Sequence, residues 1–247
     1  SRLTSRAMFL HHNQVVVFGR SLAERGIEPY IDFLLRDHEA REEVPMVIAD
    51  DKAADILSVE LEQDRISGEF LARLLHDMAA ISPYYRMRTF DFASKLFDGI
   101  ASSAVPIVQV IQVGSKKKIE MSGMAVFKLD KMVGSLSISE AEGYIWAMGG
   151  VNKSIVSVPT EKGTANLYIL SIATKRAMTL KPEGGVQARL NVSANLVIGE
   201  LSGFQGMSIE ELMAYLTEQA QITISARIVD CVQRARAMDA DIYGFCD

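Results

Sequence analysis

A strict alternation of apolar and polar residues over residues 186–196 constrains the fold more than any other feature of the sequence. The odd positions are all polar, whereas the even positions carry Val186, Ala188, Leu190, Val192, Ala194 and Leu196. Successive side chains of a strand point to opposite faces of a sheet. The pattern therefore predicts a half-buried antiparallel strand.

A long helix is predicted after this strand. Ser208 and Glu211 have the spacing of a capping box, in which a serine and a glutamate three residues later satisfy free helix N–H groups reciprocally. The helix that they open runs for about 30 residues, to near Asp239. Because residues 156–158 and 167–173 are also strand-like, the C-terminal part predicts an antiparallel sheet covered by a long helix.

Two apolar runs near the N-terminus, residues 14–18 and 44–49, predict buried strands. A helical pattern follows each run, and the one after the second run extends through Leu57. This order is typical of a parallel α/β unit with a right-handed crossover. We expect Asp50 or Asp51 to cap the helix that ends at Leu57.

Seven of the eight residues 36–43 can carry charge. Asp32 and Arg36 are four residues apart, as are Asp37 and Arg41, so each pair can meet on a helix surface. We therefore interpret the stretch as the solvated end of a helix rather than as a catalytic cluster.

Residues 66–100 have helical periodicity. Ser67 is a candidate N-cap of a first helix, and Thr89 begins a second helix with Phe90 and Phe97 among its predicted inward residues. Strand patterns and a further helix follow this region.

Residues 106–113 and 119–128 predict a strand and its returning partner, joined by a GSKKK turn. Ser139 and Glu142 predict another capping box, and the helix that they open ends at Gly149.

These elements predict a multidomain α+β protein. Residues 1–65 are expected to be the C-terminal part of a partial parallel α/β N-terminal domain. Residues 66–150 are expected to form a small α+β middle domain. Residues 151–247 are expected to form a truncated third domain, with an antiparallel sheet and a long C-terminal helix.

Composition narrows the function classes. A net charge of −5 leaves no basic footprint, so we expect no nucleic-acid partner. Cys231 and Cys246 match no zinc-binding spacing, and no run of about 18 apolar residues predicts a membrane span. Residues 1–10 lack the apolar core of a signal peptide and do not begin with methionine, so we expect an internal piece or a processed form.

The search for enzyme motifs gives a negative result. The sequence has no GxxxxGK[ST], no GxGxxG after a strand, no GxSxG and no HExxH. We interpret the four histidines, His11, His12, His38 and His76, as surface residues rather than ligands or bases. The sequence thus predicts no catalytic residue, no cofactor-binding residue and no metal ligand.

Two features each leave an alternative open. Asp50 and Asp51 follow a predicted strand, a position where open α/β sheets bind ligands, although a helix cap explains them as well. Lys116, Lys117 and Lys118 fit a solvated turn, but they could also contact anionic lipid head groups.

Three segments carry long, gapped patterns of one family. They are residues 26–57 (GIEPYIDFLLRDHEAREEVPMVIADDKAADIL), residues 122–150 (SGMAVFKLDKMVGSLSISEAEGYIWAMGG) and residues 239–245 (DADIYGF). Over these segments the chain resembles the C subunit of the nutrient germinant receptors of endospore-forming bacteria. The family begins with a signal peptide and a lipid-modified cysteine, which are not found here, and often has a glycine where this chain has Cys246.

The resemblance implies a lipoprotein on the outer face of the inner spore membrane, assembled with two membrane-embedded subunits, A and B. It implies an N-terminal lipid anchor that this fragment does not contain, and no cofactor. We therefore expect a non-catalytic receptor subunit, not an enzyme, that acts through protein contacts. The alternatives are a module that binds an amino acid or sugar, and a hydrolase or transferase without a familiar motif.

Overall fold

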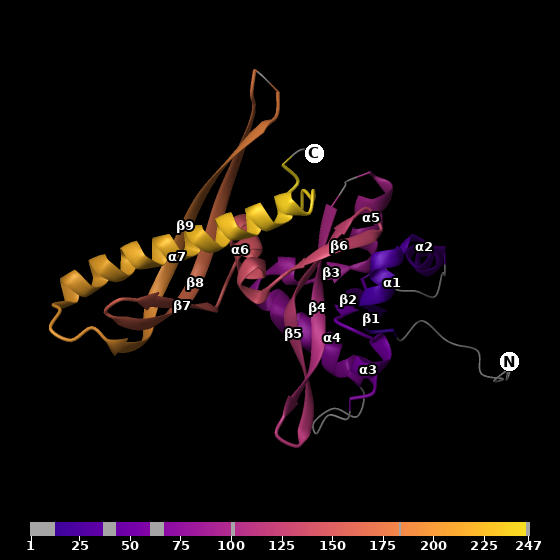
Figure 1. Ribbon diagram of the computed structural model, residues 1–247, viewed down its shortest axis with the longest axis horizontal. Coiled ribbons are helices and arrows are strands. Elements are labelled where there is room, and N and C mark those ends of the chain that lie inside the picture. Colours follow the sequence, from indigo (N-terminus) through magenta and orange to yellow (C-terminus); the bar gives the residue numbers. More distant parts are fainter. Residues whose placement is uncertain (1–12, 37–42, 60–66, 100–101, 183, 246–247) are drawn as a thin grey trace. The chain divides into compact units, whose positions relative to one another are not determined.

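The chain folds into two compact units, each with its own β-sheet. The computed structural model describes residues 13–36, 43–59, 67–99, 102–182 and 184–245 (Figure 1). Unit 1 comprises residues 1–75 and 87–133, and unit 2 comprises residues 76–86 and 134–247.

Unit 1 is built on a six-stranded mixed sheet. Its strands are β1 (Val16–Gly19), β2 (Pro45–Ala49), β3 (Met87–Arg88), β4 (Ser102–Val113), β5 (Lys116–Lys128) and β6 (Lys131–Leu136). The order is β1-β2-β4-β5-β6, with β3 paired to β2. The first three strands of this order are parallel, and β5 returns antiparallel to β4. The predicted parallel unit is therefore confirmed.

Helices cover both faces of this sheet. They are α1 (Arg20–Arg25), α2 (Glu28–Arg36), α3 (Ala53–Leu57), α4 (Ser67–Ile81) and α5 (Thr89–Phe97). Met46 and Ile48 of β2 point into a core with α1, α2 and α5. Val47 and Ala49 point into a second core with α3 and α4. Since a strand alternates its side chains, this double covering explains why the whole of β2 is apolar and buried.

Unit 2 pairs an antiparallel sheet with two helices. Its elements are a short 3₁₀ helix, η2 (Pro83–Tyr85), then α6 (Ile138–Met148), β7 (Ser154–Thr160), β8 (Gly163–Leu180), β9 (Val186–Gly203) and α7 (Ile209–Ala237). The strands lie in the order β7-β8-β9 (Figure 1). The predicted antiparallel strand is confirmed as part of β9, where Leu190, Val192 and Leu196 are half-buried.

The long C-terminal helix begins at the predicted capping box. The Ser208 hydroxyl accepts a hydrogen bond from the Glu211 N–H at 3.3 Å, and the Glu211 carboxylate accepts one from the Ser208 N–H at 2.9 Å. The 29-residue α7 buries a stripe of residues about four apart, including Leu216, Ala220 and Ile224. This spacing is the apolar stripe of a surface helix. The predicted fold class, α+β with a partly parallel sheet and a separate antiparallel sheet, is confirmed.

The capping box of α6 was predicted two residues too late. The segment SISEAE contains overlapping serine–glutamate spacings, and the structure uses Ser137 and Glu140 instead of Ser139 and Glu142. Strand β6 ends at Leu136, so the chain can enter the helix directly at Ser137. Glu142 then lies on the helix and is available for a contact with α7.

Two predictions about the helical region are also wrong. Phe90 and Phe97 were expected to point inward, but they are 45% and 54% exposed. Phe92 is buried instead, and its ring meets the Phe127 ring at 5.2 Å between centroids. Ser67 does not cap α4, because it is within the helix and its hydroxyl donates to the Val59 carbonyl at 2.8 Å.

The two units do not coincide with the three predicted domains 1–65, 66–150 and 151–247. Strands β4 and β5, from the predicted middle domain, pair into the same sheet as β1 and β2. The predicted domain limits of this chain stay a prediction.

Candidate functional site

Asp50 and Asp51 lie at the carboxyl end of β2, where a ligand or a cap was expected. The Asp50 carboxylate forms an ion pair with the Arg20 guanidinium, whose Nε also donates to the Asp50 carbonyl at 3.0 Å. The Arg20 N–H donates to the Asp51 carbonyl at 3.1 Å. These contacts join the start of α1 to the end of β2.

The predicted cap at this position is wrong. The N-cap residue of α3 is Lys52, and it makes no side-chain capping hydrogen bond. Asp50 is instead engaged by Arg20, and Asp51 is exposed. Among the described residues, no further polar side chain contacts Asp50 or Asp51. These contacts therefore add no support for the alternative of a bound ligand.

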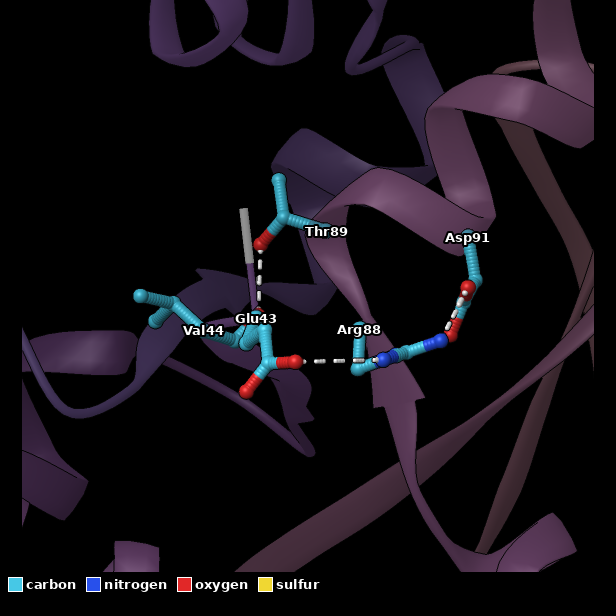
Figure 2. A network of polar contacts seen from close by, with 5 residues as sticks. All are labelled: Glu43, Val44, Arg88, Thr89 and Asp91. Atoms are coloured by element: carbon cyan, nitrogen blue, oxygen red, sulfur yellow. Dashed lines mark hydrogen bonds and ion pairs between the residues drawn. The ribbon is translucent and has the colours of Figure 1, made fainter. Parts of the chain in front are cut away.

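A polar network joins β3 and α5 to the residues before β2 (Figure 2). The Arg88 guanidinium donates in a fork to both Asp91 carboxylate oxygens, at 2.6 and 2.9 Å, and lies 3.7 Å from the Glu43 carboxylate. The Thr89 N–H and hydroxyl both donate to the Val44 carbonyl, at 2.9 and 2.8 Å.

The bonded Asp91 carboxylate raises the pKa of Arg88 further above its usual value. An arginine that is charged at every accessible pH cannot exchange a proton during a reaction. The network therefore holds the start of α5 in place and does not form an acid–base pair.

A second polar cluster lies between α6 and α7. The Glu142 carboxylate pairs with the Arg227 guanidinium, and these side chains are 19% and 22% exposed. The guanidinium carbon also lies 5.3 Å from the centroid of the Trp146 ring. Arg227 thus connects the two helices through both charge and ring contact.

Burial raises the pKa of Glu142, although the nearby Arg227 charge and hydrogen bond act in the opposite direction. A raised folded-state pKa means that the folded protein binds this proton more tightly than the unfolded chain. The contribution of Glu142 to stability therefore falls as the pH rises from the unfolded pKa through the folded one. Desolvation of the Glu142 carboxylate therefore has a larger effect on its pKa than the ion pair with Arg227. This balance is typical of a contact that positions the two helices more than it stabilises them.

The DADIYGF segment closes the core of unit 2. The Tyr243 ring lies 5.6 Å from the Tyr144 ring and stacks on the Phe245 ring at 5.0 Å between centroids. The Tyr243 carbonyl accepts a hydrogen bond from Arg176 of β8 at 3.2 Å. In the described part of the chain, the DADIYGF segment therefore has a role in packing.

Cys231 of α7 is buried in the same region. Burial raises the pKa of the Cys231 thiol to about 11. Since the thiolate is the nucleophilic form, this thiol is unreactive near neutral pH. Cys246, the other cysteine, lies outside the described residues.

The three lysines occupy the start of β5 rather than a turn, which consists of Gly114 and Ser115. Lys116, Lys117 and Lys118 are exposed and pair across the hairpin with Val113, Gln112 and Ile111. The hypothesis of a contact with lipid head groups stays open.

The predicted histidine and ion-pair residues are only partly within the described ranges. His76 is exposed on α4, whereas His11, His12, His38 and the predicted Asp37–Arg41 pair lie outside the described residues. The predicted pair of Asp32 and Arg36 is present at 2.9 Å.

Within the described ranges, no three acidic, histidine or cysteine side chains are grouped to hold a metal ion. None of the described helices is long and apolar enough to cross a membrane.

These observations define a class of protein: an α+β chain of two units, one built on a partly parallel sheet and the other on an antiparallel sheet with a long helix. Residues 1–110 match the family described as spore germination protein N-terminal domain, and residues 122–247 match the family described as spore germination B3/GerAC like, C-terminal. The chain belongs to this GerAC-like spore germination family, the C-subunit family of germinant receptors. The resemblance seen in the sequence is confirmed.

Individual relatives agree with this membership. The chain is 22% identical over 252 residues to the putative spore germination protein YfkR of Bacillus subtilis (strain 168). The match covers 98% of this chain, which spans 64% of the length of that relative. The crystal structure of the GerBC protein is similar with a TM-score of 0.73 and 16% identity, over 94% of this chain and 67% of that one. This likeness supports the fold.

Proposed function

We propose that this protein is a non-catalytic subunit of a nutrient germinant receptor and acts in spore germination through contacts with the membrane-embedded A and B subunits. In this proposal an N-terminal lipid anchor holds it to the outer face of the inner spore membrane. It transmits or stabilises a receptor state and does not turn over a substrate.

The observation that carries the proposal is the use of the ionisable groups in unit 2. Glu142 and Arg227 bind each other between two helices, and the thiol of Cys231 is buried. A reaction site needs such groups to converge on a cleft that substrate can enter. Groups committed to internal packing instead support a protein that works through its surfaces.

Exposed apolar side chains on α2 give unit 1 a surface suited to a protein partner. Tyr30 and Phe33 are 47% and 61% exposed on this helix. Aromatic residues are enriched at protein interfaces relative to other surfaces. This helix is a candidate for contact with a receptor subunit.

Crosslinking in intact spores tests the proposal. Single cysteines are introduced in a Cys246→Ser background at exposed positions, Phe33→Cys on α2 and Lys117→Cys at the β4–β5 hairpin. We expect a thiol-reactive crosslinker to capture the A or B subunit from at least one position. The Cys246→Ser parent, whose remaining Cys231 is buried, is the matched control. Failure to capture either subunit from a wider set of exposed positions contradicts the proposal.

The alternative, a module that binds an amino acid or sugar, has a separate test. Calorimetry of the purified protein against such nutrients distinguishes it, because a dissociation constant below about 1 mM would make direct binding the better description.

A further inference from the structure

The end of the β4–β5 hairpin extends past the helices that cover the sheet of unit 1 (Figure 1). Residues 112–118, which we call the hairpin tip, are all exposed. The pairing of the two strands is unbroken from Val108 to Val113, and the Gly114 carbonyl accepts a hydrogen bond from the Gln112 side chain at 2.9 Å. The hairpin tip is therefore a regular two-stranded structure with exposed side chains.

Positive charge is concentrated at the hairpin tip. Lys116, Lys117 and Lys118 are consecutive there, and residues 111–119 contain no acidic residue. The first acidic residue after them is Glu120, whose carboxylate accepts a hydrogen bond from the side-chain amide of residue 109 at 2.8 Å. The whole chain has a net charge of −5, so the tip is opposite in sign to the protein as a whole. An anionic surface therefore attracts the tip while it repels the net charge of the protein.

Lysine and apolar side chains share one face of the hairpin end. Val113 pairs with Lys116, and Ile111 pairs with Lys118. Since residues that pair across an antiparallel ladder lie on the same face, each lysine here has an apolar neighbour. Val113 is 44% exposed although it is apolar. A lysine can lay its methylene groups along apolar surface while its ammonium group stays in water. The face therefore combines apolar area with positive charge, as amphipathic segments at a membrane interface do.

Nucleic acids, acidic polypeptides and anionic lipids are the partners that carry negative charge. Domains that bind nucleic acid are usually basic overall, whereas this chain has a net charge of −5. Protein interfaces are enriched in arginine and aromatic residues and depleted in lysine. The hairpin tip has three lysines and neither an arginine nor an aromatic residue. Lipid head groups need no fixed donor geometry, which suits the compact charge and flexible stem of lysine. The composition of the tip therefore favours a lipid surface.

We propose that the hairpin tip docks on an anionic lipid surface. The ammonium groups of its lysines lie among the phosphate groups, and Val113 enters the boundary between head groups and acyl chains. Each lysine near such a surface strengthens binding about fivefold, so three lysines together give roughly a 100-fold gain. A contact of this strength orients a protein that a second attachment also holds. The inference rests on the proposed function only for the source of the lipid, which is the membrane that carries the subunit.

Vesicle binding by the purified 247-residue protein tests the inference. Phosphatidylcholine vesicles with about 30 mol% phosphatidylglycerol are compared with vesicles of phosphatidylcholine alone. An environment-sensitive fluorophore is attached to Ser115→Cys in a Cys246→Ser background, where the remaining Cys231 is buried. We expect its emission to shift to the blue with the anionic vesicles only, and the shift to be lost at about 1 M salt, where charges are screened within about 3 Å. The same fluorophore at Ala177→Cys, an exposed position of β8, is expected not to shift.

Two triple variants that lose the same charge separate the hairpin tip from the net charge of the protein. The first replaces the three lysines of the tip with glutamine and is expected to bind anionic vesicles about tenfold more weakly or worse. The second replaces three exposed lysines of unit 2 and is expected to bind within about twofold of the wild type. The second set is Lys153→Gln, Lys175→Gln and Lys181→Gln. Circular dichroism checks that both variants fold.

Several outcomes overturn the inference. They are no binding to anionic vesicles, equal binding to anionic and neutral vesicles, equal losses in the two triple variants, or unchanged emission of the fluorophore at Ser115→Cys. Binding to soluble polyglutamate without binding to anionic vesicles identifies an acidic polypeptide as the partner and also overturns it. Crosslinking from α2 to the A or B subunit is a separate measurement, so the proposed function and this inference can fail independently.

Discussion

Gly143 allows α6 and α7 to approach through their backbones, and its replacement by alanine is a quantitative test of this packing. A Cβ atom added there would lie 2.1 Å from the Arg227 carbonyl oxygen and 2.6 Å from its carbonyl carbon. Ordinary contact begins at 3.4 Å. Both atoms belong to the backbone of a 29-residue helix and cannot rotate away, so Gly143→Ala must separate the helices by roughly 1 Å.

The expected loss of stability is the difference between two effects. Overpacking a core costs about 1–3 kcal/mol, and a rigid backbone partner puts this contact near 3 kcal/mol. Alanine in a helix interior is more favourable than glycine by about 1 kcal/mol. The free energy of unfolding should therefore fall by about 2 kcal/mol, which corresponds to a decrease of about 8 °C in the midpoint temperature.

Urea denaturation followed by tryptophan fluorescence measures this effect within unit 2. The protein has one tryptophan, Trp146, which is buried in α6. Gly134→Ala is the matched control, because its added Cβ would meet the flexible Met238 side chain, which can move aside. This control should change the free energy of unfolding by less than about 0.5 kcal/mol. A Gly143→Ala protein that unfolds at or above the wild-type midpoint would refute the reasoning.

Further expectations concern single side chains. Glu142→Gln should be as stable as the wild type at pH 7 or slightly more stable, because the raised pKa of Glu142 means that its ionised form is the costly one in the folded state. In urea titrations from pH 4 to 7.5, the wild type should lose stability relative to this variant as the pH rises; the opposite slope would contradict the assignment. In a Cys246→Ser background, Cys231 should react with a thiol reagent at pH 8 far more slowly than the unfolded chain, because a thiol with a pKa of about 11 is roughly 0.1% thiolate there. Equal rates would show that the thiol is accessible. Thr89→Val should lower the free energy of unfolding by about 1 kcal/mol in thermal or urea denaturation, because the hydroxyl's bond to the Val44 carbonyl is lost, and an unchanged midpoint would count against this role.

Local patterns were sufficient where one segment decides its own conformation. The alternation in residues 186–196 predicted β9, and the spacing of Ser208 and Glu211 predicted the start of α7. Both patterns depend only on residues a few positions apart in the sequence, so they could be recognised without the tertiary structure. The long family patterns likewise predicted membership without knowledge of the tertiary contacts.

Ambiguous patterns needed the tertiary structure. Two overlapping capping boxes fit the α6 segment equally well. The position of β6 and the ion pair between Arg227 and Glu142 decided between them. Phe90 and Phe92 lie on the same short helix, and periodicity alone did not say which side would meet Phe127.

The amino-acid sequence by itself determined most of the long secondary elements, the parallel unit of β1 and β2, the antiparallel character of β9 and the family of this protein, because these follow from short-range periodicity and recurring motifs. Only the tertiary structure decided that Asp50 pairs with Arg20, that Glu142 pairs with Arg227 and that residues of β9 and α7 line one groove. Each of these contacts joins residues more than 20 positions apart. Their geometry depends on how whole helices and strands pack, which a local pattern cannot specify.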